Sequence, residues 1–100
     1  MLVREWIKAQ GTTEITPHKQ VNRVVNLLAE EDFDLLQIQG DDKSILFHMA
    51  RRDDKGREEN AMVICLDLDD PKDGYVQRDH FEGHKAPPRV ALADYGPKLH

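Results

Sequence analysis

Residues 33–68 have the sequence FDLLQIQGDDKSILFHMARRDDKGREENAMVICLDL, and this stretch decides the fold. From Asp34 onward, apolar residues recur at every second position in three segments, 35–39, 45–51 and 61–68, which is the period of a β-strand. Polar residues that tolerate turn geometry separate the segments, at 40–43 and at 53–56. Because short polar connections join neighbouring antiparallel strands, the stretch predicts a three-stranded antiparallel meander.

Alternation along these segments sorts the side chains onto two faces of the predicted sheet. The first face, against which we expect a helix to pack, carries Leu36, Ile38, Ile45, Phe47, Met49, Ile64, Leu66 and Leu68. The second face carries Leu46, His48, Ala50, Ala61, Val63 and Cys65. This second face is too apolar for full exposure to water, so we expect a helix at 2–10, the C-terminal segment or a partner to cover it.

Two helices are predicted before the meander. In 2–10, apolar residues lie on one helical side and Gly11 follows as a C-cap, although a first β-strand is the alternative. Thr16-Pro17 is a typical helix start, and the apolar stripe that follows predicts a longer helix ending near Glu31.

After residue 68 a polar run ending at Gly74 breaks regular structure, and 75–78 and 89–95 predict two further strands. The expected fold is a single α+β domain over 1–100. Its two layers are one or two N-terminal helices and an antiparallel β-meander of three to five strands. In element order alone it is similar to the chaperones of type III secretion.

Composition narrows the class of protein. The 100 residues carry a net charge of −5, with 33% charged and 39% hydrophobic side chains. One cysteine cannot form an internal disulfide, and the N-terminus has no apolar run of signal-peptide or membrane-spanning length. We therefore expect a small cytoplasmic protein whose overall charge disfavours direct binding to nucleic acid.

The function expected first is non-catalytic protein binding, as in a small acidic inhibitor, immunity protein or adaptor. A sheet face or an acidic surface would contact a protein partner, such as a basic nucleic-acid-binding protein, or a second copy in a homodimer. The candidate residues are the anchors Trp6, Leu46, His48 and Val63 and the acidic residues Glu30, Glu31, Asp32, Asp67, Asp69 and Asp70. No cofactor is expected.

An enzymatic alternative rests on His80 and His84, which lie among Asp79 and Glu82. Imidazole and carboxylate together suit a divalent metal, and such a site would serve a hydrolase or nuclease. The short sequences Asp79-His80 and Gly83-His84-Lys85-Ala86-Pro87 resemble two motifs in which a β-strand carries a histidine. One is the motif of the His-Asn-His endonucleases, and the other is the Asp-Arg-Gly-His motif of the nonspecific nucleases. That resemblance implies water activation by His80 or His84, and it implies a downstream metal ligand, yet no Asn follows Asn60.

A third possibility is nucleic-acid binding through Arg51, Arg52, Lys55 and Arg57. Acidic residues are interspersed among these basic side chains, so the segment is more typical of a solvated turn. Cys65, between apolar neighbours in a predicted strand, is expected to be a small core residue.

Overall fold

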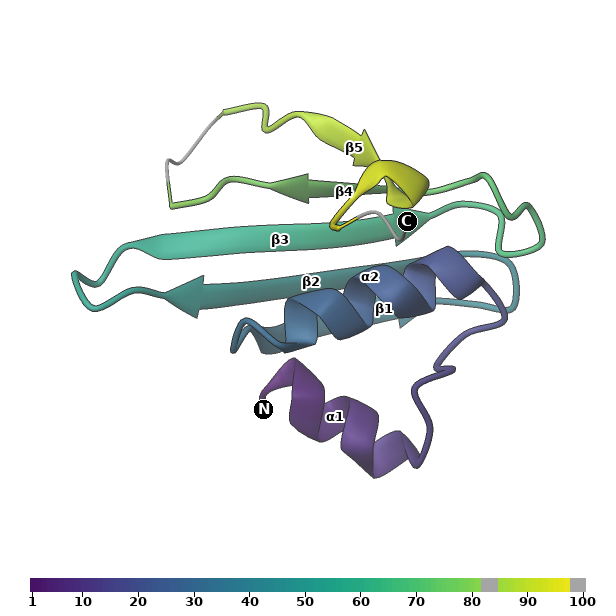
Figure 1. Cartoon of the computed structure of the whole chain (residues 1–100), viewed down its shortest axis with the longest axis horizontal. Coiled ribbons are helices and arrows are strands. Elements are labelled where there is room, and N and C mark those ends of the chain that lie inside the picture. Colours follow the sequence, from purple (N-terminus) through teal and green to yellow (C-terminus); the bar gives the residue numbers. More distant parts are fainter. Residues whose placement is uncertain (82–84, 98–100) are drawn as a thin grey trace.

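The structure is a computed structural model that describes residues 1–81 and 85–97. Two helices come first, α1 (Val3–Gln10) and α2 (Lys19–Ala29). Five strands follow, β1 (Asp34–Gly40), β2 (Ile45–Arg52), β3 (Glu58–Cys65), β4 (Tyr75–Arg78) and β5 (Arg89–Ala91), and the short 3-10 helix η1 (Leu92–Asp94) comes after them. The strands form one antiparallel sheet in chain order, with α2 lying across one face (Figure 1). The predicted fold class, N-terminal helices packed on an antiparallel meander, is confirmed.

The ends of the helices follow local chemistry. α1 ends at Gly11, whose φ of 76° is the left-handed conformation that glycine adopts without strain. α2 begins later than the Thr16-Pro17 signal predicts, because its N-cap is His18, whose Nδ1 accepts a hydrogen bond from the Val21 N–H. Thr16 instead donates its hydroxyl to the Asn22 side chain at 2.8 Å, which fixes the entry into the helix.

The register between β2 and β3 corrects the predicted faces. Phe47 lies opposite Val63 and Met49 lies opposite Ala61, and directly opposed residues share a face. The helix-facing side of β3 therefore carries Ala61, Val63 and Cys65, the reverse of the prediction. The reason is that β3 is apolar on both faces, so its alternation alone does not fix its phase.

The core lies between the sheet and the helices. Trp6 of α1 meets Phe47 edge-on, with ring centroids 5.7 Å apart, so α1 packs on the same side as α2. A register shift between Leu35 and Gln37 turns Leu35 toward the core and leaves Leu36 55% exposed, contrary to its predicted place in the core. The fully buried side chains on which this layer is built are Val3, Val21, Val24, Val25, Leu28, Phe33, Phe47, Met49, Val63 and Val76.

The second face of the sheet stays open in the described part of the chain. The expected covers do not lie there: α1 is on the helix side, and β4 and β5 extend the sheet at its edge (Figure 1). Among the described residues, no helix has the length and apolar character needed to cross a membrane.

Candidate functional site

The open face of the sheet is built from two central rows of side chains. Pairing places Leu46, Ile64 and Tyr75 in one row and His48, Met62 and Gln77 in the next. All six are partly exposed. On β2, β3 and β4 neither row contains Asp, Glu, Lys or Arg, although one residue in three of the chain is charged. Arg89 of β5 continues the second row, opposite Gln77. We use the name open face for these six residues.

Neighbouring groups hold the polar side chains of the open face in place. His48 Nε2 lies 3.0 Å from Asn60 Oδ1, and Gln77 donates to the Pro87 carbonyl at 3.1 Å. At the β5 edge, the Arg89 guanidinium stacks over the Tyr75 ring, 4.5 Å from its centroid. The face is therefore an ordered, largely uncharged surface.

One end of the open face adjoins acidic loops. The Leu68 N–H donates to the Lys43 carbonyl at 2.7 Å, which joins the loop after β1 to the loop after β3. A hollow of about 340 Å³ opens beside them, with Leu46, Ile64 and Leu66 among the residues that line it.

The loop after β3 is shaped by Asp73. Its Oδ2 accepts the N–H groups of Leu66 and Asp67, each at 2.7 Å. Burial alone raises the pKa of this carboxyl, but the amide hydrogen bonds outweigh that effect, so the pKa lies below its ordinary value. Asp73 therefore fixes the backbone path of this loop through its side-chain hydrogen bonds.

The other end of the sheet contains a buried ion cluster on the helix side, made of Glu31, Arg51, Glu59 and Arg78. Glu59 is fully buried, and its carboxylate accepts from Arg51 Nε at 2.7 Å and from Arg78. Arg78 also pairs with both carboxylate oxygens of Glu31, at 2.6 and 2.8 Å, and donates to the Tyr95 hydroxyl at 2.7 Å. The cluster thereby ties β2, β3 and β4 to the end of α2 and to the C-terminal segment.

Their ionic partners keep Glu59 and Arg78 of this cluster ionised. Burial alone would raise the pKa of Glu59, but hydrogen bonds from Arg78 and Arg51 hold it below its ordinary value. For Arg78, burial acts to lower the pKa, and the bonds to Glu31 and Glu59 raise it above its ordinary value. The Phe33 ring lies under both guanidinium groups, 5.0 Å from Arg51 and 5.3 Å from Arg78.

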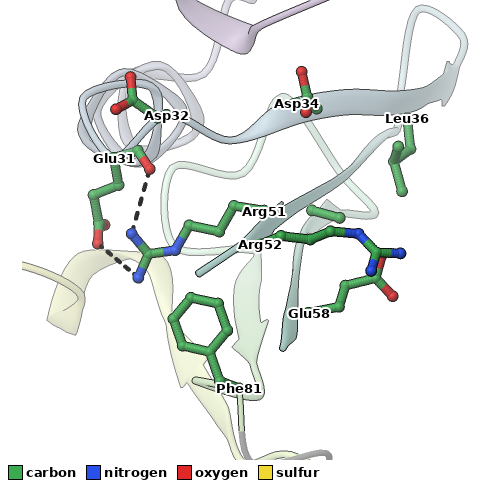
Figure 2. A pocket seen from close by; sticks show the side chains of 9 residues that line it. Glu31, Asp32, Asp34, Leu36, Arg51, Arg52, Glu58 and Phe81 are labelled. Atoms are coloured by element: carbon green, nitrogen blue, oxygen red, sulfur yellow. Dashed lines mark hydrogen bonds and ion pairs between the residues drawn. The ribbon is translucent and has the colours of Figure 1, made fainter. Parts of the chain in front are cut away.

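A larger hollow of about 530 Å³ lies beside the ion cluster. Figure 2 shows Arg51 at its centre, held by the backbone carbonyl and the carboxylate of Glu31, with Phe81 across from it. Arg52 and Glu58 pair with each other on the far wall. The cations that line this hollow, Arg51 and Arg52, already have carboxylate partners.

The predicted contact residues divide among several places. Leu46 and His48 lie on the open face, whereas Val63 is buried in the core and Trp6 lies on the helix side. The predicted position of Val63 on the second face is therefore wrong, and Trp6 lies on the other side of the sheet from that face.

The predicted acidic residues likewise separate into two groups. Glu30, Glu31 and Asp32 lie at the end of α2, where Glu31 joins the ion cluster and Asp32 pairs with Arg4. Asp67, Asp69 and Asp70 lie in the loop after β3, at the opposite end of the sheet, and their side chains are exposed. The acid that lines the hollow of the open face is Asp41, whereas Asp69 lines a separate hollow beside His18 at the start of α2.

The described residues give little support to the predicted metal site at His80 and His84. His80 is 63% exposed at its side chain, and its carboxylate neighbour is Glu59, 3.5 Å away and already bound by two arginines. Within 1–81 and 85–97, no three His, Cys, Asp or Glu side chains gather as a metal site would require. His84 and Glu82 lie outside the described residues.

The structure also places Cys65 and the basic segment 51–57, the remaining candidates from the sequence. Cys65 is buried, and burial raises the pKa of its thiol to about 11, which keeps it protonated at neutral pH. Arg57 pairs with Asp53 at 2.7 Å, while Arg51 and Arg52 pair as described above; Lys55 is exposed at the hairpin tip. The basic segment is thus a hairpin whose arginines are paired with carboxylates.

Sequence reasoning missed Met62, Ile64, Tyr75 and Gln77 on the open face and Glu59 and Arg78 in the ion cluster. The hairpin turn is centred on Lys55, which sets Arg51 opposite Glu59 and Arg52 opposite Glu58. The predicted turn at 53–56 is displaced by half a residue and would instead have set Arg51 opposite Glu58. Comparison of the chain with protein-family models, with curated proteins and with solved structures finds no match for it.

Proposed function

We propose that this protein is a non-catalytic protein-binding module whose contact surface is the open face of the sheet. The observation that carries the proposal is the contrast between this face and the rest of the molecule. In a chain with 33% charged residues, two adjacent rows on three strands contain no Asp, Glu, Lys or Arg. Uncharged, aromatic-containing and methionine-containing patches with a charged rim are typical of protein interfaces.

The partner we infer is a protein with an apolar projection and a basic surround. The hollow beside Leu46, Ile64 and Leu66 accepts the projection. The loop acids Asp67, Asp69 and Asp70, together with a net charge of −5, attract the basic surround and accelerate encounter. A cytoplasmic setting agrees with one cysteine that is free and buried.

The test is capture of partners from a lysate by the C-terminally tagged protein, compared with two single variants. Ile64→Lys places a charge in the open face and is expected to weaken binding of the captured protein at least about tenfold, since an unpaired charge is desolvated in the interface. Ala9→Lys adds the same charge on the exposed side of α1 and is expected to bind as the wild type does.

The captured protein is then purified and titrated into labelled protein by NMR. Shifts concentrated on β2, β3 and β4 open-face residues support the proposal. Binding that Ile64→Lys leaves intact, or shifts confined to the helix side, would refute it.

A further inference from the structure

The outer edge of β1 is only partly paired. The N-terminal residues run antiparallel to its beginning: the Val3 N–H donates to the Phe33 carbonyl at 2.9 Å, and the Leu35 N–H donates to the Met1 carbonyl at 2.8 Å. Beyond Leu35, no strand of the described chain pairs with this edge, and every residue of 36–40 is exposed. Residues 36–40 thus form a stretch of strand edge that no described segment covers.

The direction of the free backbone groups follows from the ladder. The Asp41 N–H donates to the Ser44 carbonyl at 3.0 Å at the hairpin turn. Since hydrogen-bonded and non-bonded pairs alternate in an antiparallel ladder, Ile38 and Gly40 direct their N–H and C=O groups away from β2. The outward N–H of Leu35, beyond the register shift, fits the same alternation.

The side chains of this edge lack the usual protection. Residues 36–40 read Leu-Gln-Ile-Gln-Gly, without the charge or proline that commonly prevents strand edges from pairing with other chains. Of the four large apolar residues with exposed side chains in the described part, three lie here: Met1 at 69%, Leu36 at 55% and Ile38 at 37%. An uncharged apolar edge on an acidic protein suits an equally acidic partner.

We propose that β1 pairs antiparallel with β1 of a second copy of this chain, about a twofold axis at Ile38, so that two sheets become one continuous sheet. The free segment 36–40 is symmetric about Ile38, and Met1 begins to occupy the edge where this segment stops. The second copy's strand likewise turns away after Gly40, into the turn that leads to β2.

The side chains of 36–40 complement themselves under this symmetry. Ile38 faces Ile38 of the second copy on the helix side, and Leu36 faces Gly40 of the second copy, which has no side chain in the way. Gln37 faces Gln39 of the second copy on the other side; in one chain these two amides already lie 3.4 Å apart. No charged residue lies within the ladder, so two chains of net charge −5 meet there without opposed like charges.

The size of the contact sets its strength. At about 3.4 Å per residue, five residues give a ladder of roughly 17 Å. Such an edge buries less than the ~1,200 Å² at the lower limit of stable interfaces, so the dimer dissociates on dilution. This inference is independent of the partner proposed for the open face.

The test is sedimentation equilibrium of the C-terminally tagged protein from about 1 μM to about 1 mM, the range of weak dissociation constants. An N-terminal tag is avoided because it would extend along the same strand edge. The average mass is expected to rise toward twice the chain mass of 11.5 kDa. A monomer at every concentration overturns the proposal.

Charge exchange tests the register. Q37E/Q39E and Q37K/Q39K each oppose like charges across the twofold axis and are expected to stay monomeric, whereas an equimolar mixture of the two associates. Q37K/Q39E sets the new lysine of each copy opposite the new glutamate of the other, and it is expected to dimerise as the wild type does or more tightly. Failure of both the mixture and Q37K/Q39E to associate contradicts the pairing.

A matched control separates this edge from the open face. Gln77→Glu adds a charge on β4, within the open face and away from β1, and is expected to leave the dimer intact. If Gln77→Glu abolishes the dimer while Q37E/Q39E does not, two copies associate through their open faces and the edge pairing is wrong. Ile64→Lys, which tests the proposed partner, is expected to dimerise normally.

Discussion

The two ends of the sheet use their carboxylates in opposite ways. At the end where β2 stops and β3 starts, the Glu59 carboxylate is buried and neutralised by the side chains of Arg51 and Arg78. At the other end, Asp73 lies near the surface and accepts backbone N–H groups of the loop after β3. The first end therefore fixes how distant elements pack, and the second fixes the path of one loop.

This difference also bears on recognition. The charges of the ion cluster attract a charged partner weakly, because both of its cations, Arg51 and Arg78, already have a carboxylate beside them. At the loop end, Asp73 is turned inward, while Asp67, Asp69 and Asp70 stay exposed in the loop after β3. The structure thus separates an end whose charges are paired with one another from an end with exposed carboxylates.

The largest effect is expected from breaking the ion cluster. Glu59→Gln removes the buried negative charge and leaves two guanidinium groups facing an amide, so we expect the free energy of unfolding to fall by about 3–5 kcal/mol. Urea denaturation measures it. The neighbouring Glu58→Gln is the control; its side chain is exposed, and we expect a change within about 0.5 kcal/mol.

The pH dependence of the free energy of unfolding, compared between the wild type and Glu59→Gln, tests whether the lost stability comes from the charge of Glu59. The pKa of Glu59 is lower in the folded state than in the unfolded chain, where it is about 4.3. Its stabilisation is therefore complete above that unfolded value and is lost as the pH falls through the folded pKa. The stability gap between wild type and Glu59→Gln should narrow as the pH falls below about 4. A gap that stays constant down to about pH 3 would show that packing, and not charge, is lost.

How far the sequence predicts this fold is clear from the neighbourhood of Glu59. The existence and order of both helices and of the strands follow from periodicity and turn residues, and β4 is predicted at Tyr75–Arg78, where it lies. The limits of β3 do not follow, because its first residues are charged and resemble the preceding turn. Their charges are satisfied across the hairpin, by Arg51 and Arg52, which is information about pairing that periodicity does not contain.

The candidate site is predicted less well than the fold. Leu46 and His48 are assigned to the open face correctly because β2 has one strongly apolar side, formed by Ile45, Phe47 and Met49. The residues of β3 are placed on the wrong side because both of its faces are apolar. A phase error of one residue moved Val63 out of the core and Ile64 into it.

An intermediate effect is expected at the loop end. Asp73→Ala removes the acceptor of two backbone N–H groups, and hydrogen bonds to a charged group contribute more than neutral ones, so we expect a loss of about 2 kcal/mol. Thermal and urea unfolding measure the loss. Asp70→Ala, which removes the acceptor of one N–H, that of Lys72, is the matched control and is expected to cost less. Equal losses in the two variants would contradict the role assigned to Asp73.

The smallest effect is expected one residue from the ion cluster. Arg51 and Arg52 are adjacent on β2, but alternation turns Arg51 to the helix side and leaves Arg52 70% exposed, 3.8 Å from Glu58. Because an exposed ion pair gains little over solvation, Arg52→Gln is expected to change the free energy of unfolding by about 0–1 kcal/mol. Arg51→Gln unpairs the buried Glu59 in part and is expected to cost several times more. Urea denaturation of both variants compares the same substitution on opposite faces of one strand. Equal losses of stability would mean that burial of the ion cluster is not what stabilises this end of the sheet.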